Sequence, residues 1–213
     1  MDEADEKTEF TFDELSPEAK KKALSAPREP HDEWWDDVYY DAVTVGNLLG
    51  INIGTLSRNI KRYAIFFSGF SSQGDGASYV GYYAHPKADI AKAVAEHAPK
   101  DAELKRIAES LAVLQVRCRL TYGGSLQATI TTRGHYCHSG TMQFDVAHTN
   151  DEVSGYSEAF EELQAGLERL LRDFADWIYD RLEDEYDYLT SEEAAIEDFN
   201  SCGRKFDEDG VML

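Results

Sequence analysis

The chain has 213 residues and carries 41 acidic against 21 basic side chains, a formal net charge of −20 at neutral pH. Binding to nucleic acid by counterion release needs a basic face, and binding to an anionic membrane surface needs clustered Lys and Arg. The charge therefore argues against both modes, and we expect no direct binding to nucleic acid or membrane. A hydrophobic content of 42% is enough for a packed core.

The sequence shows neither a targeting signal nor a cysteine pattern typical of a disulfide framework or a structural zinc site. It has no apolar run of the 18 or more residues that a transmembrane helix requires. Residues 1–7 are acidic where a signal peptide would be basic and then apolar, so we expect a disordered acidic tail and a cytoplasmic protein. Cys118, Cys137 and Cys202 form no C-x-x-C pair, which argues against a disulfide framework and a structural zinc site. We expect no cofactor.

The N-terminal region is predicted to hold a short strand and two helices. Alternating polar and apolar residues predict a strand over 8–12. Ser16 and Pro17 are typical of an N-cap and a first helical position. Apolar residues at spacings of three and four predict a second helix over about 32–49, which Gly50 would end.

The middle of the chain is predicted to form the sheet. β-forming runs joined by a Gly-rich link over 68–76 predict an antiparallel pair of strands at 62–67 and 77–84. Two helices are expected next, one after Pro86 to about His97 and one over about 101–115. Three more strands are then predicted, with Gly123 and Gly124 as a hairpin turn between the first two, at 116–122, 126–132 and 141–147.

The final third is predicted to be helical. One apolar stripe runs over about 157–189, and Thr190 with Glu193 resembles a capping box that would start a short helix to about Asn200. Strands in the middle with helices before and after predict one α+β domain over residues 1–213, in which helices cover one face of an antiparallel sheet of about five strands.

Acidic residues recur along the long C-terminal helix. Their spacings of 3, 4, 3 and 4 put five carboxylates in one file, which we call the acidic file: Asp173, Asp176, Asp180, Glu183 and Asp187. At about 1.5 Å per residue the file is roughly 21 Å long. It is either a solvated helix face or a surface that docks on a groove built for a phosphate backbone.

Two further segments carry residue types used in chemistry. The Gly-rich link contains Gln73 and Asp75 but matches neither the Walker nor the dinucleotide pattern, so it is either a ligand loop or an ordinary turn. His135, Cys137 and His138 are metal-ligand types, yet on a strand His138 would point away from the other two. Hydrogen-bonded histidines at a strand end are the simpler interpretation, and we predict no metal.

Several segments together resemble a group of proteins carried by tailed bacteriophages and prophages, some of them labelled antitoxins of toxin–antitoxin systems. The most specific is Ser68 to Ala77, Ser-Gly-Phe-Ser-Ser-Gln-Gly-Asp-Gly-Ala. The other segments are 12–16, Ala19-Lys20, 98–101, 135–139 and 172–179. The resemblance spans most of the chain and implies a mobile element inside a bacterial cell. It implies no catalytic residue.

Charge and resemblance together predict a non-enzymatic inhibitor of a host defence complex, such as a CRISPR effector or a restriction enzyme. The acidic file would bind the basic groove of that complex, helped by Asp36, Asp37 and Asp41. Two alternatives remain open: an antitoxin that sequesters a co-encoded toxin, and a small enzyme that uses Gln73 to Gly76 with His135 and His138. The sequence also leaves a homodimer open.

Overall fold

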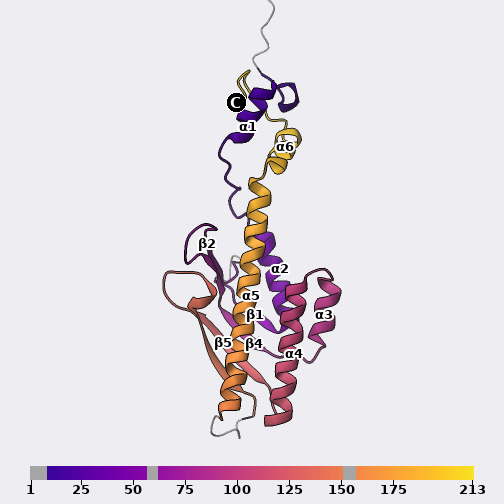
Figure 1. Ribbon diagram of the computed structural model, residues 1–213, viewed down its shortest axis with the longest axis vertical. Helices are drawn as coiled ribbons and strands as arrows, with labels where there is room; N and C mark the ends of the chain where they lie inside the picture. Colours follow the sequence, from indigo (N-terminus) through magenta and orange to yellow (C-terminus); the bar gives the residue numbers. More distant parts are fainter. Residues whose placement is uncertain (1–8, 57–61, 151–156) are drawn as a thin grey trace, which may run out of the picture. The chain divides into compact units, whose positions relative to one another are not determined.

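Figure 1 shows the computed structural model, which describes residues 9–56, 62–150 and 157–213. The fold is α+β with an antiparallel sheet and a long C-terminal helix, as predicted. The chain divides into two compact units: a larger one, Trp35–Leu182, and a smaller one formed by Met1–Trp34 with Glu183–Leu213. The sequence predicted one domain over residues 1–213, and that organisation stays a prediction, because compact units are not necessarily separate domains.

The larger unit is built on two antiparallel sheets. The main sheet has the strand order β1-β4-β5-β6, from β1 (Ile51–Ile53), β4 (Gly81–Ala84), β5 (Leu126–Thr132) and β6 (Met142–His148). The second sheet pairs β2 (Ile65–Ser68) with β3 (Gly76–Tyr79). In β5 and β6 the pairing runs from Leu126 opposite His148 to Thr132 opposite Met142.

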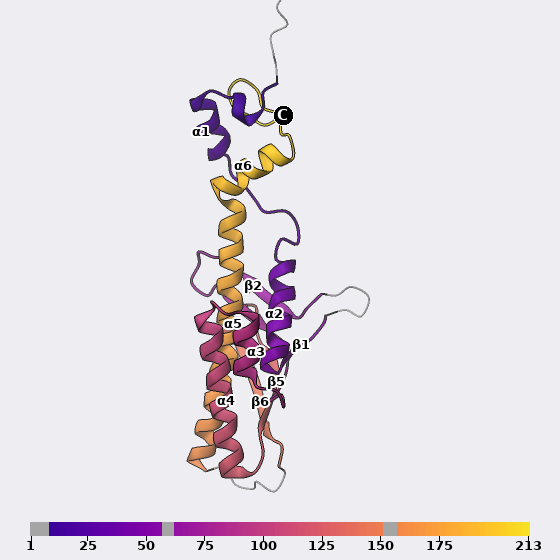
Figure 2. The same cartoon turned by 90° about the vertical axis from the view of Figure 1, so that its right-hand side faces the viewer.

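Helices cover one face of the main sheet. They are α2 (Asp36–Leu49), α3 (Ile90–His97), α4 (Ala102–Tyr122) and α5 (Glu158–Thr190), of which residues up to Leu182 belong to this unit. Figures 1 and 2 show α4 and α5 side by side over the sheet. Along β5 the side chains of Leu126, Ala128 and Ile130 are buried, whereas Thr129 and Thr131 are exposed. This alternation is typical of a sheet with one covered face and one open face.

A buried glutamine joins α4 to β5. Gln115 is completely buried, and its Nε2 donates to the carbonyl of Leu126 at 3.0 Å and to the hydroxyl of Tyr83 at 3.1 Å. Its Oε1 accepts from the backbone N–H of Leu126 at 2.9 Å. The amide thus satisfies backbone groups at the start of β5 that burial would otherwise leave unpaired.

The prediction of a strand over 116–122 is wrong, because these residues are the last two turns of α4. Apolar residues on the exposed side of the helix, among them Val116 and Leu120, hide its helical period in the sequence. The predicted hairpin turn at Gly123 is wrong for the same reason. Gly123 is the C-cap of α4, with a φ of +75° and its N–H bonded to the carbonyl of Arg119.

Other predicted elements are confirmed with shifted boundaries. The pairing of the strands at 62–67 and 77–84 is confirmed as β2 with β3, with Ile65 opposite Tyr79, but the second run divides at Val80 and continues as β4 in the main sheet. The second helix begins at Asp36, four residues later than predicted, and β1 was not predicted. The strand at 126–132 is confirmed.

The smaller unit has its own apolar core. It contains η1 (Phe12–Glu14), α1 (Pro17–Ser25) and α6 (Glu192–Ser201), which bury residues such as Leu15, Phe199 and Phe206 together. Ser16 caps α1 as predicted, by accepting from the N–H of Ala19 at 3.2 Å. In place of the predicted strand over 8–12, of which residue 8 lies outside the described residues, Phe10 makes an isolated bridge to Phe206 and η1 begins at Phe12.

Candidate functional site

The five carboxylates of the acidic file all lie on α5, as the spacing predicted. Asp176, Asp180 and Asp187 are exposed, whereas Asp173 and Glu183 are half-buried. The first three residues of the file belong to the larger unit, and Glu183 and Asp187 belong to the smaller one. The two groups have different surroundings.

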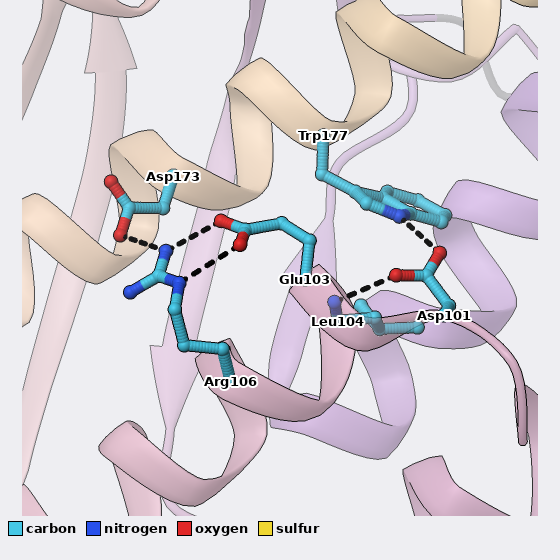
Figure 3. A network of polar contacts seen from close by, with 6 residues as sticks. All are labelled: Asp101, Glu103, Leu104, Arg106, Asp173 and Trp177. Atoms are coloured by element: carbon cyan, nitrogen blue, oxygen red, sulfur yellow. Dashed lines mark hydrogen bonds and ion pairs between the residues drawn. The ribbon is translucent and has the colours of Figure 1, made fainter.

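Asp173 is engaged inside the chain (Figure 3). Its Oδ2 accepts from Nη2 of Arg106 at 2.5 Å, and the same guanidinium binds Glu103 through Nε at 2.9 Å and Nη2 at 2.6 Å. The hydrogen bond from Arg106 lowers the pKa of Glu103, and the two carboxylates together raise the pKa of Arg106. The positive charge of Arg106 therefore offsets the negative charge of Asp173. Their ion pair links α5 to the first turns of α4.

Asp176 has a partly desolvated carboxylate. Although part of the side chain is exposed, partial burial raises the pKa of this carboxyl above its ordinary value. A hydrogen bond to Ser139 and the charge of Arg172 oppose that shift. Arg172 also donates to the carbonyl of Ser139 at 2.5 Å and lies over the ring of Phe144. Asp176 therefore belongs to a local polar cluster of α5 and the segment that precedes β6.

The three additional acidic residues lie on α2. Asp36 and Asp37 occupy its first turn, where the positive end of the helix dipole stabilises a carboxylate. Both side chains are exposed. Asp41 lies one turn further along, with its Oδ1 3.3 Å from Nε2 of His97 on α3. These positions give the three carboxylates a local structural role, and their contact with a partner stays a prediction.

The smaller unit holds most of the surplus charge. It carries 22 acidic against 7 basic side chains in 65 residues, whereas the larger unit carries 19 against 14 in 148 residues. Around Tyr188 stand three carboxylates that we call the acidic cluster: Glu185, Glu193 and Glu197. The hydroxyl of Tyr188 donates to Oε2 of Glu197 at 3.2 Å, and that bond together with the negative charges raises the pKa of the phenol.

The Gly-rich link and the histidine segment lie against each other, as the enzyme alternative requires. A Cβ at Gly76 would lie 2.6 Å from Cβ of His138, and one at Gly74 would contact the ring of Tyr136 at 3.7 Å. The Oδ2 of Asp75 accepts from the N–H of Ser72 at 2.6 Å, and this bond is the first cause of its lowered pKa. We call Gly74, Gly76, Tyr136 and His138 the loop–histidine junction.

The polar atoms of this junction have local structural tasks. Nδ1 of His138 accepts from the N–H of Gly140 at 3.1 Å and so caps the 3-10 turn η2 (Ser139–Thr141). Gln73 and His135 are exposed. Within residues 9–56, 62–150 and 157–213, no group of three or more His, Cys, Asp or Glu side chains is placed to hold a metal ion. Among the same residues, no helix combines the length and apolar content that crossing a membrane demands.

Sequence reasoning missed the residues that organise these surroundings. Arg106 is 67 positions from Asp173, and no local pattern reveals that pair. Asp101 was expected only as a helix start, and Trp177 only as a member of an apolar stripe, yet they bond to each other. The acid-rich composition of 183–198 was the one available signal for the acidic cluster.

Fold and site together define an α+β protein with a strongly acidic helical surface. The chain belongs to the family described as a domain of unknown function, DUF8835, which matches residues 34–192. The match includes the larger unit and the end of α5, and leaves α1 and most of α6 outside. Comparisons with curated proteins and with solved structures found no match.

Proposed function

We propose that the protein is a phage-encoded inhibitor of a host defence complex, and that it acts in the bacterial cytoplasm by stoichiometric binding. The observation that supports this most directly is the charge of the smaller unit. Its 22 carboxylates outnumber its seven basic side chains, so the unit keeps a surplus of fifteen negative charges that its own Lys and Arg cannot neutralise. A groove that binds nucleic acid is lined with basic side chains, so its positive charge is complementary to the negative charge of the smaller unit.

The carboxylates of the smaller unit repel one another, and binding to a basic partner would relieve that repulsion. Like charges at spacings of three and four destabilise a helix by roughly 0.2–0.5 kcal/mol per pair. The raised pKa of Tyr188 is further support, since it is caused first by the hydrogen bond to Glu197 and then by the negative charges of the acidic cluster. A basic groove would lower this repulsion, and opposite charge would speed the encounter.

Within the acidic file, Glu183 and Asp187 have the leading role in binding the partner. Both lie on the smaller unit, and Asp187 is exposed. Asp173 is already paired with Arg106, and Asp176 is partly desolvated. Both are therefore weaker candidates for contact with a basic partner than Glu183 and Asp187.

The decisive experiment measures DNA cleavage by purified CRISPR effectors and restriction enzymes of the natural host, with and without the chain. We expect stoichiometric inhibition that weakens steeply between about 50 and 500 mM salt, because screening shortens the reach of charge. The double variant Glu183→Gln, Asp187→Asn should inhibit at least tenfold less well. The triple variant Glu185→Gln, Glu193→Gln, Glu197→Gln tests the acidic cluster separately.

The matched control makes the same change of net charge on the larger unit. Asp145→Asn with Glu161→Gln neutralises two exposed carboxylates that belong to the larger unit and should inhibit as the unchanged chain does. Equal loss in both double variants would mean that net charge alone matters. Inhibition of none of the host's defence enzymes, or inhibition insensitive to salt, would overturn the proposal.

The two alternatives predict different results. If the chain is an antitoxin, it should neutralise the product of an adjacent small toxin gene and leave the defence enzymes active. The enzyme alternative is supported by the contact between the Gly-rich link and the histidine segment. It predicts that His138→Ala with an intact fold abolishes biological activity, whereas the charge variants keep it.

A further inference from the structure

One face of α4 exposes a row of large apolar side chains. Val113, Val116 and Leu120 are 68%, 49% and 83% exposed, and we call them the α4 ridge. Their spacings of three and four place them on one side of the helix, opposite buried residues such as Ile107 and Leu111. Single exposed apolar side chains are ordinary on a protein surface, but a row of three along a helix is a typical contact surface.

The α4 ridge borders an open groove. The groove lies between α4 and α5 in the larger unit, has a volume of about 790 Å³, and includes Val113 with the more buried Leu114, Leu163 and Leu170 in its lining. Two ion pairs cross from α4 to α5 here: Arg106 with Asp173 at 2.5 Å and Arg117 with Glu162 at 3.4 Å. Apolar side chains of a further helix would find an apolar lining here, with charged groups around it.

The charges on this face of α4 are arranged symmetrically about Val113. Glu109 lies four residues before Val113 and Arg117 lies four residues after it, and both side chains are exposed. If two copies of α4 pack antiparallel and centred at Val113, Glu109 of each copy stands opposite Arg117 of the other. Each copy thus carries both halves of two identical ion pairs, which Arg117 would form beside or in place of its exposed pair with Glu162.

We propose that the face of α4 centred on Val113 is the interface of a two-fold symmetric homodimer, in which α4 of two copies pack antiparallel. Val113 then meets Val113 of the other copy, and Val116 and Leu120 lie opposite Ser110 and Arg106 of that copy. Isologous contacts of this kind are the commonest in homo-oligomers because one surface serves both partners. The repulsion between two chains of net charge −20 arises mainly outside this helix, because α4 itself carries four basic and two acidic side chains. A pair of helices buries less than the roughly 1,200 Å² of a standard interface, so we expect reversible association.

The experiment is sedimentation velocity on the full chain from about 5 to 500 µM, where a modest interface populates both species. We expect a shift from monomer to dimer over this range. Val113→Glu places two like charges at the two-fold axis, and Leu120→Lys places a second cation opposite Arg106 of the other copy. Each variant should weaken association at least tenfold without altering circular dichroism, because neither side chain is buried. An unchanged chain that remains monomeric at the highest concentration overturns the proposal.

Charge exchange tests the register. Glu109→Arg alone and Arg117→Glu alone each place like charges across the axis and should weaken self-association. A mixture of the two variants should form a heterodimer, because the new arginine of one variant then faces the new glutamate of the other while the original pair is kept. Arg119→Glu makes the same charge change at an exposed position of α4 that does not face Glu109 of the other copy in this register, and should leave dimerisation unaltered. Equal self-association of all four chains, or no heterodimer in the mixture, would show that another surface is used.

Discussion

Trp177 donates its indole N–H to Oδ2 of Asp101 at 2.8 Å, while Oδ1 of the same carboxylate accepts from the N–H of Leu104, also at 2.8 Å. The carboxylate of Asp101 therefore caps α4 and also accepts the hydrogen bond of the buried indole N–H on α5 (Figure 3). The neighbouring ion pair of Arg106 with Asp173 joins the same two helices. Together these contacts fix the start of α4 against the middle of α5.

Replacing Asp101 should separate its two tasks. Asp101→Ser keeps an N-cap oxygen but leaves the indole unpaired, and should lower the free energy of unfolding by about 1 kcal/mol. Asp101→Ala loses both bonds and should lower it by about 2–3 kcal/mol. Urea denaturation of each variant in wild-type and Trp177→Phe backgrounds checks this. If the difference between wild-type and Asp101→Ser is the same in both backgrounds, the indole bond contributes nothing.

The Asp101–Trp177 pair also shows what sequence patterns can and cannot reveal. Local signals fix the elements whose periodicity is undisturbed, such as α5 and β5. They failed at the end of α4, where the exposed apolar α4 ridge hides the helical period and suggests a strand. They also failed at Val80, where one β-forming run divides between two sheets. The partner of each strand lies elsewhere in the sequence, so a local pattern does not reveal it.

Gln115 should be among the least replaceable polar residues. Gln115→Leu keeps the approximate volume but leaves the N–H and carbonyl of Leu126 and the hydroxyl of Tyr83 without this partner. We expect the free energy of unfolding to fall by about 2–4 kcal/mol. Gln143→Leu, at an exposed position of β6, is the matched control and should change it by less than about 0.5 kcal/mol. Chemical denaturation of both variants measures the difference, and equal stabilities would contradict the assigned role.

Two aspartates should respond to pH in opposite directions. Backbone N–H groups lower the pKa of Asp75 in the folded chain, so the stabilisation from its ionised form is present above the ordinary pKa and disappears as pH falls through the folded value. Burial raises the pKa of Asp176, so the fold is favoured while this group is protonated, and that advantage disappears as pH rises through the folded value.

The asparagine variants make the opposite signs measurable. At pH 7 we expect Asp75→Asn to unfold at lower temperature than the wild type and Asp176→Asn to unfold at higher temperature. Both differences should shrink toward the acidic range, where the carboxyls are protonated in folded and unfolded chains alike. Calorimetry across this range checks both signs. A lower melting temperature for Asp176→Asn at pH 7 would mean that its bond to Ser139 outweighs the burial.

The acidic file illustrates the same limit for the candidate site. Helical spacing correctly placed its five residues on one helix, because that relationship is local. The sequence could not show that Arg106 already binds Asp173, since this contact depends on how α4 and α5 pack. It also could not separate Asp176, beside Ser139, from Asp187 on the smaller unit, because both read alike as exposed helical acids.

The loop–histidine junction depends on the lack of a side chain at Gly76. In Gly76→Ala the new methyl would lie 2.6 Å from Cβ and 2.8 Å from Cα of His138, so backbone has to move. We expect the free energy of unfolding to fall by about 1–3 kcal/mol, with shifted NMR resonances for His138 and Tyr136. Gly69→Ala adds the same methyl within the same loop, where the nearest atom, Oδ2 of Asp75, is 3.5 Å away, and should change stability by less than about 0.5 kcal/mol. If Gly76→Ala is as stable as Gly69→Ala and leaves the His138 resonances in place, the two segments are not held in contact at this glycine.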